Sequence, residues 1–279
     1  MSSDSGSESY EFEDRFSQVL NEAVSAIGRS NMALQETLLP NVHRHSMPEI
    51  PVWRLHLGAT STFLGIIQCL RTRPSSLGAF SLLRGMIEAW AHLFFIADES
   101  EPDSPALRAI RFEAGVLSEW ASVSKRMNSE VDYVQLMARN HDGIKKLWTA
   151  NAGKDEPRRR TYKDVNRTLE KMAKTPELES LGIIHASSSV AVHMSASDFL
   201  LESNDLGVKV VWASDARRCA WLQLAIVSFD YLTISALSSV PNNDNEAIVQ
   251  ELHSRWQAIY NNSLLVSAVA TEGASEMHL

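Results

Sequence analysis

Three ionisable residues lie four positions apart in one of the most apolar segments of the chain. The segment SLLRGMIEAWAHLFFI, residues 81–96, contains Arg84, Glu88 and His92. On an α-helix, with about 100° between successive residues, Glu88 and His92 are rotated about 40° and about 80° from Arg84, so the three form one polar stripe. The rest of the circumference is apolar, as in a core helix. The stripe is therefore expected to face a cleft, solvent or polar groups of another helix.

The spacing of Arg84 and Glu88 permits two interpretations. In the structural one, Glu88 neutralises a buried Arg84, and the pair joins this helix to the next. In the functional one, the guanidinium of Arg84 binds an anion, and Glu88 orients it or acts as a base. A third alternative is a solvent-exposed stripe without a role.

A second group of candidate residues lies in IIHASSSVAVHMSASDF, residues 183–199. His185 and His193 are eight residues apart, Ser189 lies between them, and Asp198 follows. Serine, histidine and aspartate are the side chains of a hydrolytic triad, but they act only when they converge in space. The alternative is that these histidines are hydrogen-bonded structural residues.

Arg111 lies on the helix expected to follow the polar stripe, among Ile110, Ala114 and Leu117. If Arg84 and Arg111 converge, they form a site for phosphate or a carboxylate. Otherwise Arg111 reaches the surface or pairs with Glu88. The sequence has no GxxxxGK[ST], GxGxxG or HExxH motif and no Glu-x-x-His pair, so we predict neither a metal site nor a cofactor.

The elements that carry these residues are predicted to be helices. Apolar residues recur at helical spacing over residues 12–38, 52–72, 76–97, 105–127, 129–149, 162–173, 176–197, 215–240 and 243–262. Ser75 and Ser76 are candidate caps of the third helix, and Ser104 followed by Pro105 is typical of a helix start. Residues 199–212 break the pattern and favour a small β-hairpin or an extended crossover. The predicted fold class is an all-α multi-helix bundle with long central helices.

The composition is that of a globular protein, and the length fits one large helical domain or two small ones. The chain has 279 residues, of which 44% are hydrophobic, two cysteines and a net charge of −8. These values favour a reducing cytoplasm and argue against a general nucleic-acid coat or an anionic-membrane binder. We expect residues 1–9 to be disordered, residues 10–262 to form one helical domain, and residues 263–279 to be a flexible tail. We also expect no signal peptide and no transmembrane helix.

The order of three segments resembles a group of bacterial all-helical proteins catalogued as a domain of unknown function. The segments are LLRGMIEAWAHLFFI, RAIRFEAG and HASSSVAVHMS. The pattern of that group is an Arg and a Glu four apart, an Arg–aromatic pair on the next helix, and a Ser-rich stretch ending in His and a small residue. The matching positions within residues 80–200 are Arg84, Glu88, Arg111, Phe112, His193 and Ser195.

Some families of this kind look like relatives of the higher-eukaryote-and-prokaryote nucleotide-binding (HEPN) ribonucleases of defence and toxin systems. Their signature is an Arg and a His on one helix with four to six residues between them. This sequence departs from it, because seven residues separate Arg84 and His92. That departure puts metal-independent RNA cleavage in doubt.

Three functions are predicted from these observations. The first is a protein that binds a small anionic ligand, a nucleotide or an RNA end, through Arg84, Glu88, Arg111 and His193, with His92 and Ser189 as further ligand contacts. A defence or stress role is implied only by the resemblance. The second is a metal-independent ribonuclease or other hydrolase in which His193, Arg84 and Glu88 are catalytic. The third is a non-enzymatic interaction protein that dimerises through its tryptophan-bearing helices and has a structural Arg84–Glu88 pair.

Overall fold

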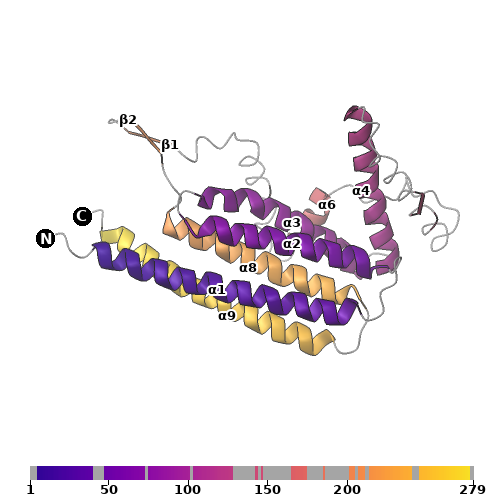
Figure 1. The fold of residues 1–279 in the computed structure, drawn as a ribbon, viewed down its shortest axis with the longest axis horizontal. Coiled ribbons are helices and arrows are strands. Elements are labelled where there is room, and N and C mark those ends of the chain that lie inside the picture. The colour runs from indigo at the N-terminus through magenta and orange to yellow at the C-terminus, as the bar shows by residue number, and fades with distance from the viewer. Residues whose placement is uncertain are drawn as a thin grey trace.

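The computed structural model describes residues 5–39, 47–72, 75–100, 103–127, 142–143, 146, 165–174, 185, 201–204, 207–210, 214–240 and 245–276. Within these ranges the chain forms seven helices and one two-stranded antiparallel sheet (Figure 1). The all-α bundle predicted from the sequence is confirmed.

Five long helices lie lengthwise along one another (Figure 1). They are α1 (Ser5–Leu38), α2 (Glu49–Leu70), α3 (Ser76–Ala97), α8 (Asp215–Ser238) and α9 (Asn245–Glu276). In the view of Figure 1, α1, α3 and α8 run in one direction and α2 and α9 in the other, so both chain ends lie at the same end of the bundle. The remaining helices, α4 (Pro105–Met127) and α6 (Val165–Met172), flank α3, and α4 rises steeply at the opposite end.

The core is continuous through the five long helices because each places an apolar stripe against α8 or its neighbours. At the centre, the ring of Phe63 on α2 lies 5.2 Å from Phe229 on α8 and 5.7 Å from Trp256 on α9, between ring centroids. All three side chains are buried. A second stack joins Trp90 on α3 to Tyr231 on α8, with ring centroids 5.4 Å apart.

The helix boundaries follow local capping chemistry. Ser104 accepts a hydrogen bond from the backbone N–H of Leu107, which confirms it as the cap preceding Pro105. Ser75 directly precedes α3, as predicted, but its side chain makes no capping hydrogen bond to that helix. Its hydroxyl instead donates to the carbonyl of Cys69 near the end of α2. Ser214 caps α8 by accepting from the N–H of Arg217.

Both predicted chain ends require correction. Helix α1 begins at Ser5, within the segment expected to be disordered, and α9 continues to Glu276, beyond the expected domain end at 262. The segment NNS at 261–263 has weak helix propensity, but Ser263 and Val266 are buried against the bundle, and this packing outweighs local preference.

The irregular segment before α8 contains the expected hairpin. Strand β1 (Leu201–Asn204) pairs antiparallel with β2 (Gly207–Val210), with Leu201 opposite Val210. The helices predicted at 129–149 and 176–197 lie almost entirely outside the described residues.

Within the part of the chain that the structure describes, two helices are long and apolar enough to cross a membrane by length and composition. They are the stretches Gly78–Ala97 and Asp215–Ser238, and half or slightly more of each apolar window is buried inside the bundle. They are α3 and α8, whose apolar character also suits the centre of a helical bundle.

Candidate functional site

The polar stripe of α3 forms an ion pair that extends to a distant histidine. Arg84 Nε donates to Glu88 Oε1 at 2.8 Å, and His185 Nε2 lies 3.0 Å from the same oxygen. Both side chains on α3 are about one-third exposed, whereas His185 is largely buried. Burial alone would raise the pKa of Glu88, but the hydrogen bonds and charges of Arg84 and His185 outweigh it and hold the pKa below its usual value. Glu88 is therefore an ionised acceptor that joins α3 to residue 185.

His92, the third member of the stripe, is enclosed by the neighbouring helix. Its ring lies 4.8 Å from the ring of Phe112 on α4, between centroids. Burial lowers the pKa of His92 to about 4, and the charge of Glu88 only partly offsets this effect. The imidazole is consequently neutral at pH 7, which leaves it without the charge an anion site would use.

Arg111 is engaged at the far end of α3. Its Nη1 donates to Asp103 at 2.9 Å, and its guanidinium carbon lies 5.3 Å from the centroid of the Phe95 ring. Phe95 follows Arg84 by 11 residues, which is about 16 Å along the helix at a rise of about 1.5 Å per residue. The contacts of Arg84 and Arg111 therefore lie at different levels of α3. His193 and Ser189 lie outside the described residues.

The fully buried arginine of α4 is Arg108, one turn before Arg111. It donates to the carbonyls of Ile96 and Asp103, and so holds the end of α3 to the start of α4. The sequence analysis did not single it out.

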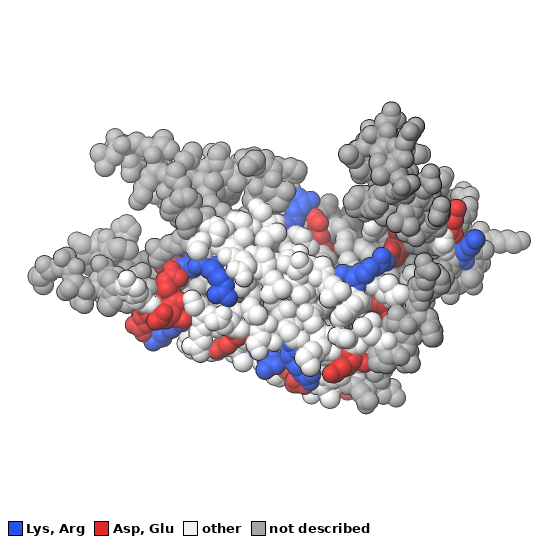
Figure 2. Space-filling view, viewed as in Figure 1, with Lys and Arg blue, Asp and Glu red and all other residues white. Residues whose placement is uncertain are grey.

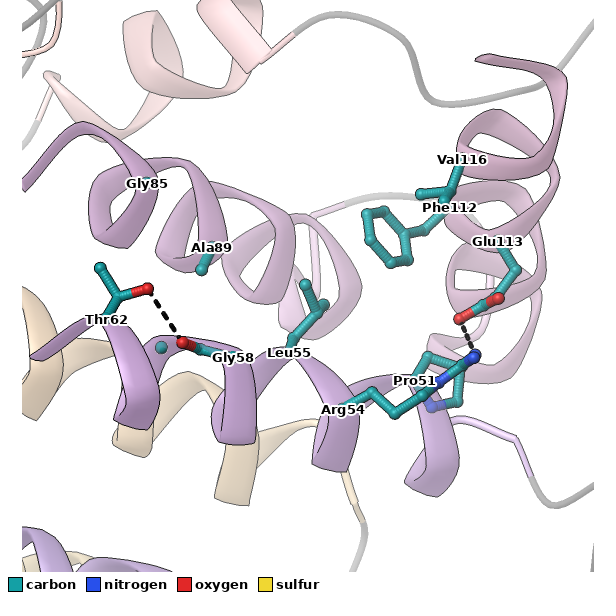
Figure 3. Close-up of a pocket in the computed structure, with 11 residues that line it drawn as sticks. Pro51, Arg54, Leu55, Gly58, Thr62, Gly85, Ala89, Phe112, Glu113 and Val116 are labelled. Atoms are coloured by element: carbon teal, nitrogen blue, oxygen red, sulfur yellow. Dashed lines mark hydrogen bonds and ion pairs between the residues drawn. The ribbon is translucent and has the colours of Figure 1, made fainter. Parts of the chain in front are cut away.

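A pocket lies between α2, α3 and α4 (Figure 3), and Phe112, one of the positions matched in the sequence analysis, lines it. Its volume is about 400 Å³, within the range of small-molecule sites. The walls are mostly apolar or small. They comprise Pro51, Leu55, Gly58, Ala59, Thr62, Gly85, Ala89, Phe112 and Val116, together with the charged residues Arg54 and Glu113.

The charged wall of the pocket is formed by Arg54 of α2 and Glu113 of α4. Arg54 Nη2 donates to Glu113 Oε1, and Figure 3 shows the arginine extending across to the carboxylate. The Glu113 side chain is only 11% exposed, whereas that of Arg54 is 58% exposed. Burial raises the pKa of Glu113, and Arg54 offsets this only in part. The guanidinium has five N–H donors, and within the described part of the chain Glu113 is its one polar partner.

Arg54, which was not among the predicted site residues, stands out in the sequence. It is the one Lys, Arg, Asp or Glu between residues 50 and 70. A lone charge on an otherwise apolar helix needs a partner or a route to solvent, and Arg54 has both. Figure 2 shows that, on this side of the bundle, charged residues surround a broad area of uncharged residues.

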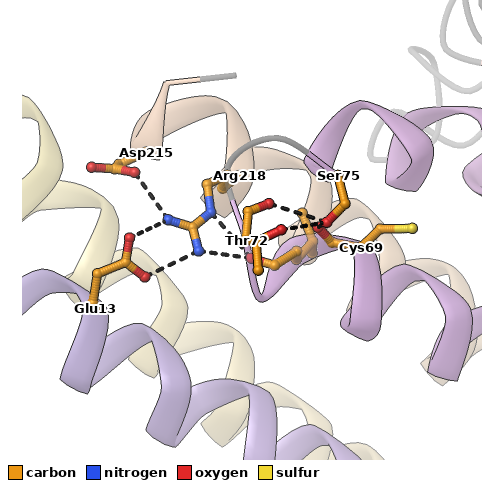
Figure 4. A network of polar contacts seen from close by, with 7 residues as sticks. Glu13, Cys69, Thr72, Ser75, Asp215 and Arg218 are labelled. Carbon is orange, nitrogen blue, oxygen red and sulfur yellow. Dashed lines mark hydrogen bonds and ion pairs between the residues drawn. The ribbon is translucent and has the colours of Figure 1, made fainter. Parts of the chain in front are cut away.

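A second polar network, at the other end of the bundle, is structural (Figure 4). The fully buried Arg218 of α8 donates to both carboxylate oxygens of Glu13, to Asp215 and to the carbonyl of Leu70. Its guanidinium carbon also lies 4.7 Å from the centroid of the Phe16 ring. These hydrogen bonds all go to groups of the protein itself. We therefore infer that Arg218 has a structural role and joins α1, α2 and α8.

Comparison of the chain with protein-family models, with curated proteins and with solved structures finds no match. The resemblance of the three sequence segments to a bacterial helical family therefore stays a prediction. The pocket geometry is the observation from which a function can be inferred.

Proposed function

We propose that the protein binds a small organic anion in the pocket between α2, α3 and α4. Arg54 is the residue that supports this proposal. Its half-exposed guanidinium lies on the pocket wall and uses only one of its N–H donors for Glu113. The free donors would bind a carboxylate, sulfonate or phosphate group of the ligand. Glu113 would keep the guanidinium oriented across the pocket.

The remaining walls favour an apolar or aromatic ligand body. Phe112 and Val116 come from α4, Leu55 from α2 and Ala89 from α3. The Phe112 ring, supported on one side by His92, is a surface against which a flat ring would pack. A nucleotide has a ring and a phosphate, so it remains within the proposed class of ligand, as do simpler aromatic acids.

The experiment compares a charged with an uncharged probe of the same shape. 8-Anilinonaphthalene-1-sulfonate has an aromatic body and one sulfonate, whereas N-phenyl-1-naphthylamine lacks the sulfonate. We expect Arg54→Ala to weaken binding of the sulfonate by about tenfold, the order of one charged hydrogen bond, and to leave binding of the neutral amine unchanged. Fluorescence titration measures both, and Arg71→Ala, a change of the exposed arginine that directly follows α2, is the matched control.

A variant that fills the pocket tests its location. A Cβ atom at Gly85 would meet nothing nearer than the Thr62 methyl group at 4.0 Å, so Gly85→Leu places a side chain in the pocket and also improves helix propensity. We expect this variant to keep the wild-type melting temperature and to lose both probes. Unchanged binding of both probes by Gly85→Leu would contradict the proposal, and competition of the sulfonate by AMP would identify nucleotides as ligands.

A further inference from the structure

Asp230 is an isolated charge in the most central helix of the bundle. Between residues 219 and 238 of α8 it is the one Asp, Glu, Lys or Arg. Its side chain is 2% exposed. A buried carboxylate is costly unless it is fully hydrogen-bonded. The contacts of Asp230 show which neighbouring group the buried charge affects.

The carboxylate of Asp230 is directed at a single partner. Its Oδ2 lies 2.7 Å from Nδ1 of His253 on α9. Its Oδ1 is buried and, within the described residues, accepts no hydrogen bond. Burial raises the pKa of Asp230 to about 6, and the charge and hydrogen bond of His253 offset this only in part.

His253 connects this buried carboxylate with solvent. Its side chain is 40% exposed, while its Nδ1 faces the buried Asp230. The opposite edge of the ring carries Nε2, which has no protein hydrogen-bond partner among the described residues and is not among the buried unsatisfied atoms. Tyr231 flanks the imidazole edge-on, with ring centroids 6.4 Å apart, and is itself stacked on Trp90.

The hydrogen bond also determines the tautomer of His253. An ionised Asp230 can only accept, so the proton of a neutral imidazole lies on Nδ1. The lone pair is then on Nε2, the nitrogen on the solvent side. A buried carboxylate that orients an imidazole in this way is the arrangement that activates histidine in hydrolytic enzymes.

The surroundings of His253 contain little charge. Asp230 is affected by the charge of His253 alone among the described groups. On α9 the nearest charged residues are Glu251, which bonds Arg29 of α1, and Arg255, and both lie two positions from His253 on the other side of the helix. On α8 the ring of Tyr231 flanks His253, and on α3 the ring of Trp90 stacks on Tyr231. An uncharged, partly aromatic setting favours an uncharged reactant over an anionic one.

We propose that His253 Nε2 is a nucleophile towards uncharged acyl donors, with Asp230 as its positioning residue. With an ester, the Nε2 lone pair attacks the carbonyl carbon, and the bond to the alkoxy oxygen breaks as the alkoxide leaves with that electron pair. The acylimidazolium is stabilised by the carboxylate of Asp230 through Nδ1–H. Water then adds to the acyl carbon and gives one proton to the alkoxide, the carboxylic acid leaves, and Nε2 regains its lone pair. The ester and water thus give an acid and an alcohol.

The test is the hydrolysis of p-nitrophenyl acetate by the full chain, followed by release of p-nitrophenolate. We expect His253→Gln to remove most of the rate above buffer and Asp230→Asn to lower it about tenfold, because asparagine does not fix the tautomer. The control His185→Gln removes another histidine and should leave the rate unchanged. Wild-type rates should rise with pH through about 6, as Asp230 ionises and can hold the proton of His253 on Nδ1.

Two further measurements separate reactivity from a structural role. If Asp230 is a positioning residue, Asp230→Asn should have a melting temperature at pH 7 equal to or above that of the wild type, because a partly unsatisfied buried charge is removed. Acetylation of His253 should be detected by peptide mass spectrometry in the wild type and be reduced in Asp230→Asn. A wild-type rate in either variant, or a lower melting temperature with an unchanged rate in Asp230→Asn, would overturn the proposal.

Discussion

His56 shows how a single hydrogen bond determines the protonation of a buried residue. Its Nε2 lies 3.2 Å from the hydroxyl of Thr233, and that hydroxyl donates its one proton to the carbonyl of Phe229. His56 Nε2 must therefore be the donor, and Nδ1 carries the lone pair. Nδ1 is buried without a hydrogen-bond partner among the described residues. Protonating it would create a buried charge without an acceptor, and burial accordingly lowers the pKa of His56 to about 3.

This geometry predicts acid sensitivity. The pKa of His56 is lower in the folded state than its ordinary value of 6.5, so the unfolded chain binds more protons below that pH. The contribution of the neutral His56 to the free energy of unfolding is therefore fully present above about pH 6.5 and is lost as the pH falls below that value. We expect His56 to contribute about 2 kcal/mol of the loss between pH 7 and pH 5. Urea unfolding at both pH values measures it, and His56→Gln should make the pH dependence shallower.

The control for this prediction is His185→Gln, which removes a histidine that lies in an ion-paired network. It should leave the slope contributed by His56 unchanged. A pH dependence identical in wild type and His56→Gln would show that His56 is protonated in the folded state, contrary to its contacts.

At the scale of elements, Arg218 determines how three helix ends meet. The start of α8 lies beside the start of α1 and the end of α2, which are far apart in the sequence. Arg218 contacts Glu13, 205 residues away, and the carbonyl of Leu70, 148 residues away. This carbonyl lies at the end of α2, where the helix itself supplies no donor.

We expect Arg218→Met to lower the free energy of unfolding by about 3 to 5 kcal/mol, even though methionine fills similar apolar space. The reason is that Glu13, Asp215 and the Leu70 carbonyl lose their hydrogen bonds from Arg218 together. Chemical denaturation provides the measurement. Arg15→Ala, which removes the exposed pair with Glu11 on the same α1 helix, should change stability by less than about 1 kcal/mol. Equal effects of the two substitutions would contradict the assignment.

The pocket is also a property of elements. Gly58 and Thr62 come from α2, Gly85 and Ala89 from α3, and Phe112 from α4. The small residues keep α2 and α3 from filling the space between them, while Phe112, Glu113 and Val116 of α4 line another side of it (Figure 3). None of the three helices makes the pocket alone.

At the scale of the whole molecule, the five long helices share one core and should unfold together. Phe63 contacts aromatic rings on α8 and α9 and is fully buried. We expect Phe63→Ala to lower the free energy of unfolding by about 3 to 5 kcal/mol. Tryptophan fluorescence and helical circular dichroism should report the same transition in the variant and in the wild type.

The exposed Leu57 on the same helix is the matched control, and Leu57→Ala should change stability by less than about 0.5 kcal/mol. Separate transitions by the two probes in the wild type would show that the bundle is not one cooperative unit.

Local pattern was sufficient to predict most of the helices. The third and fourth were predicted at 76–97 and 105–127, and α3 and α4 have these bounds. Helical periodicity and capping depend on residues within a few positions of one another, so they can be found in a single sequence. The Arg84–Glu88 pair was predictable for the same reason, because four residues make one helical turn.

The partners of the other charges were decided only by tertiary structure. Arg54 meets Glu113 from 59 residues away, and His185 meets Glu88 from 97 residues away. Arg108, and not Arg111, is the buried arginine of α4. These outcomes depend on which helices become neighbours and at what angle, and that is determined by the summed packing of the core. The amino-acid sequence by itself thus determined the helices and the stripe on α3, whereas helix packing decided the pocket and the pairing of Asp230 with His253.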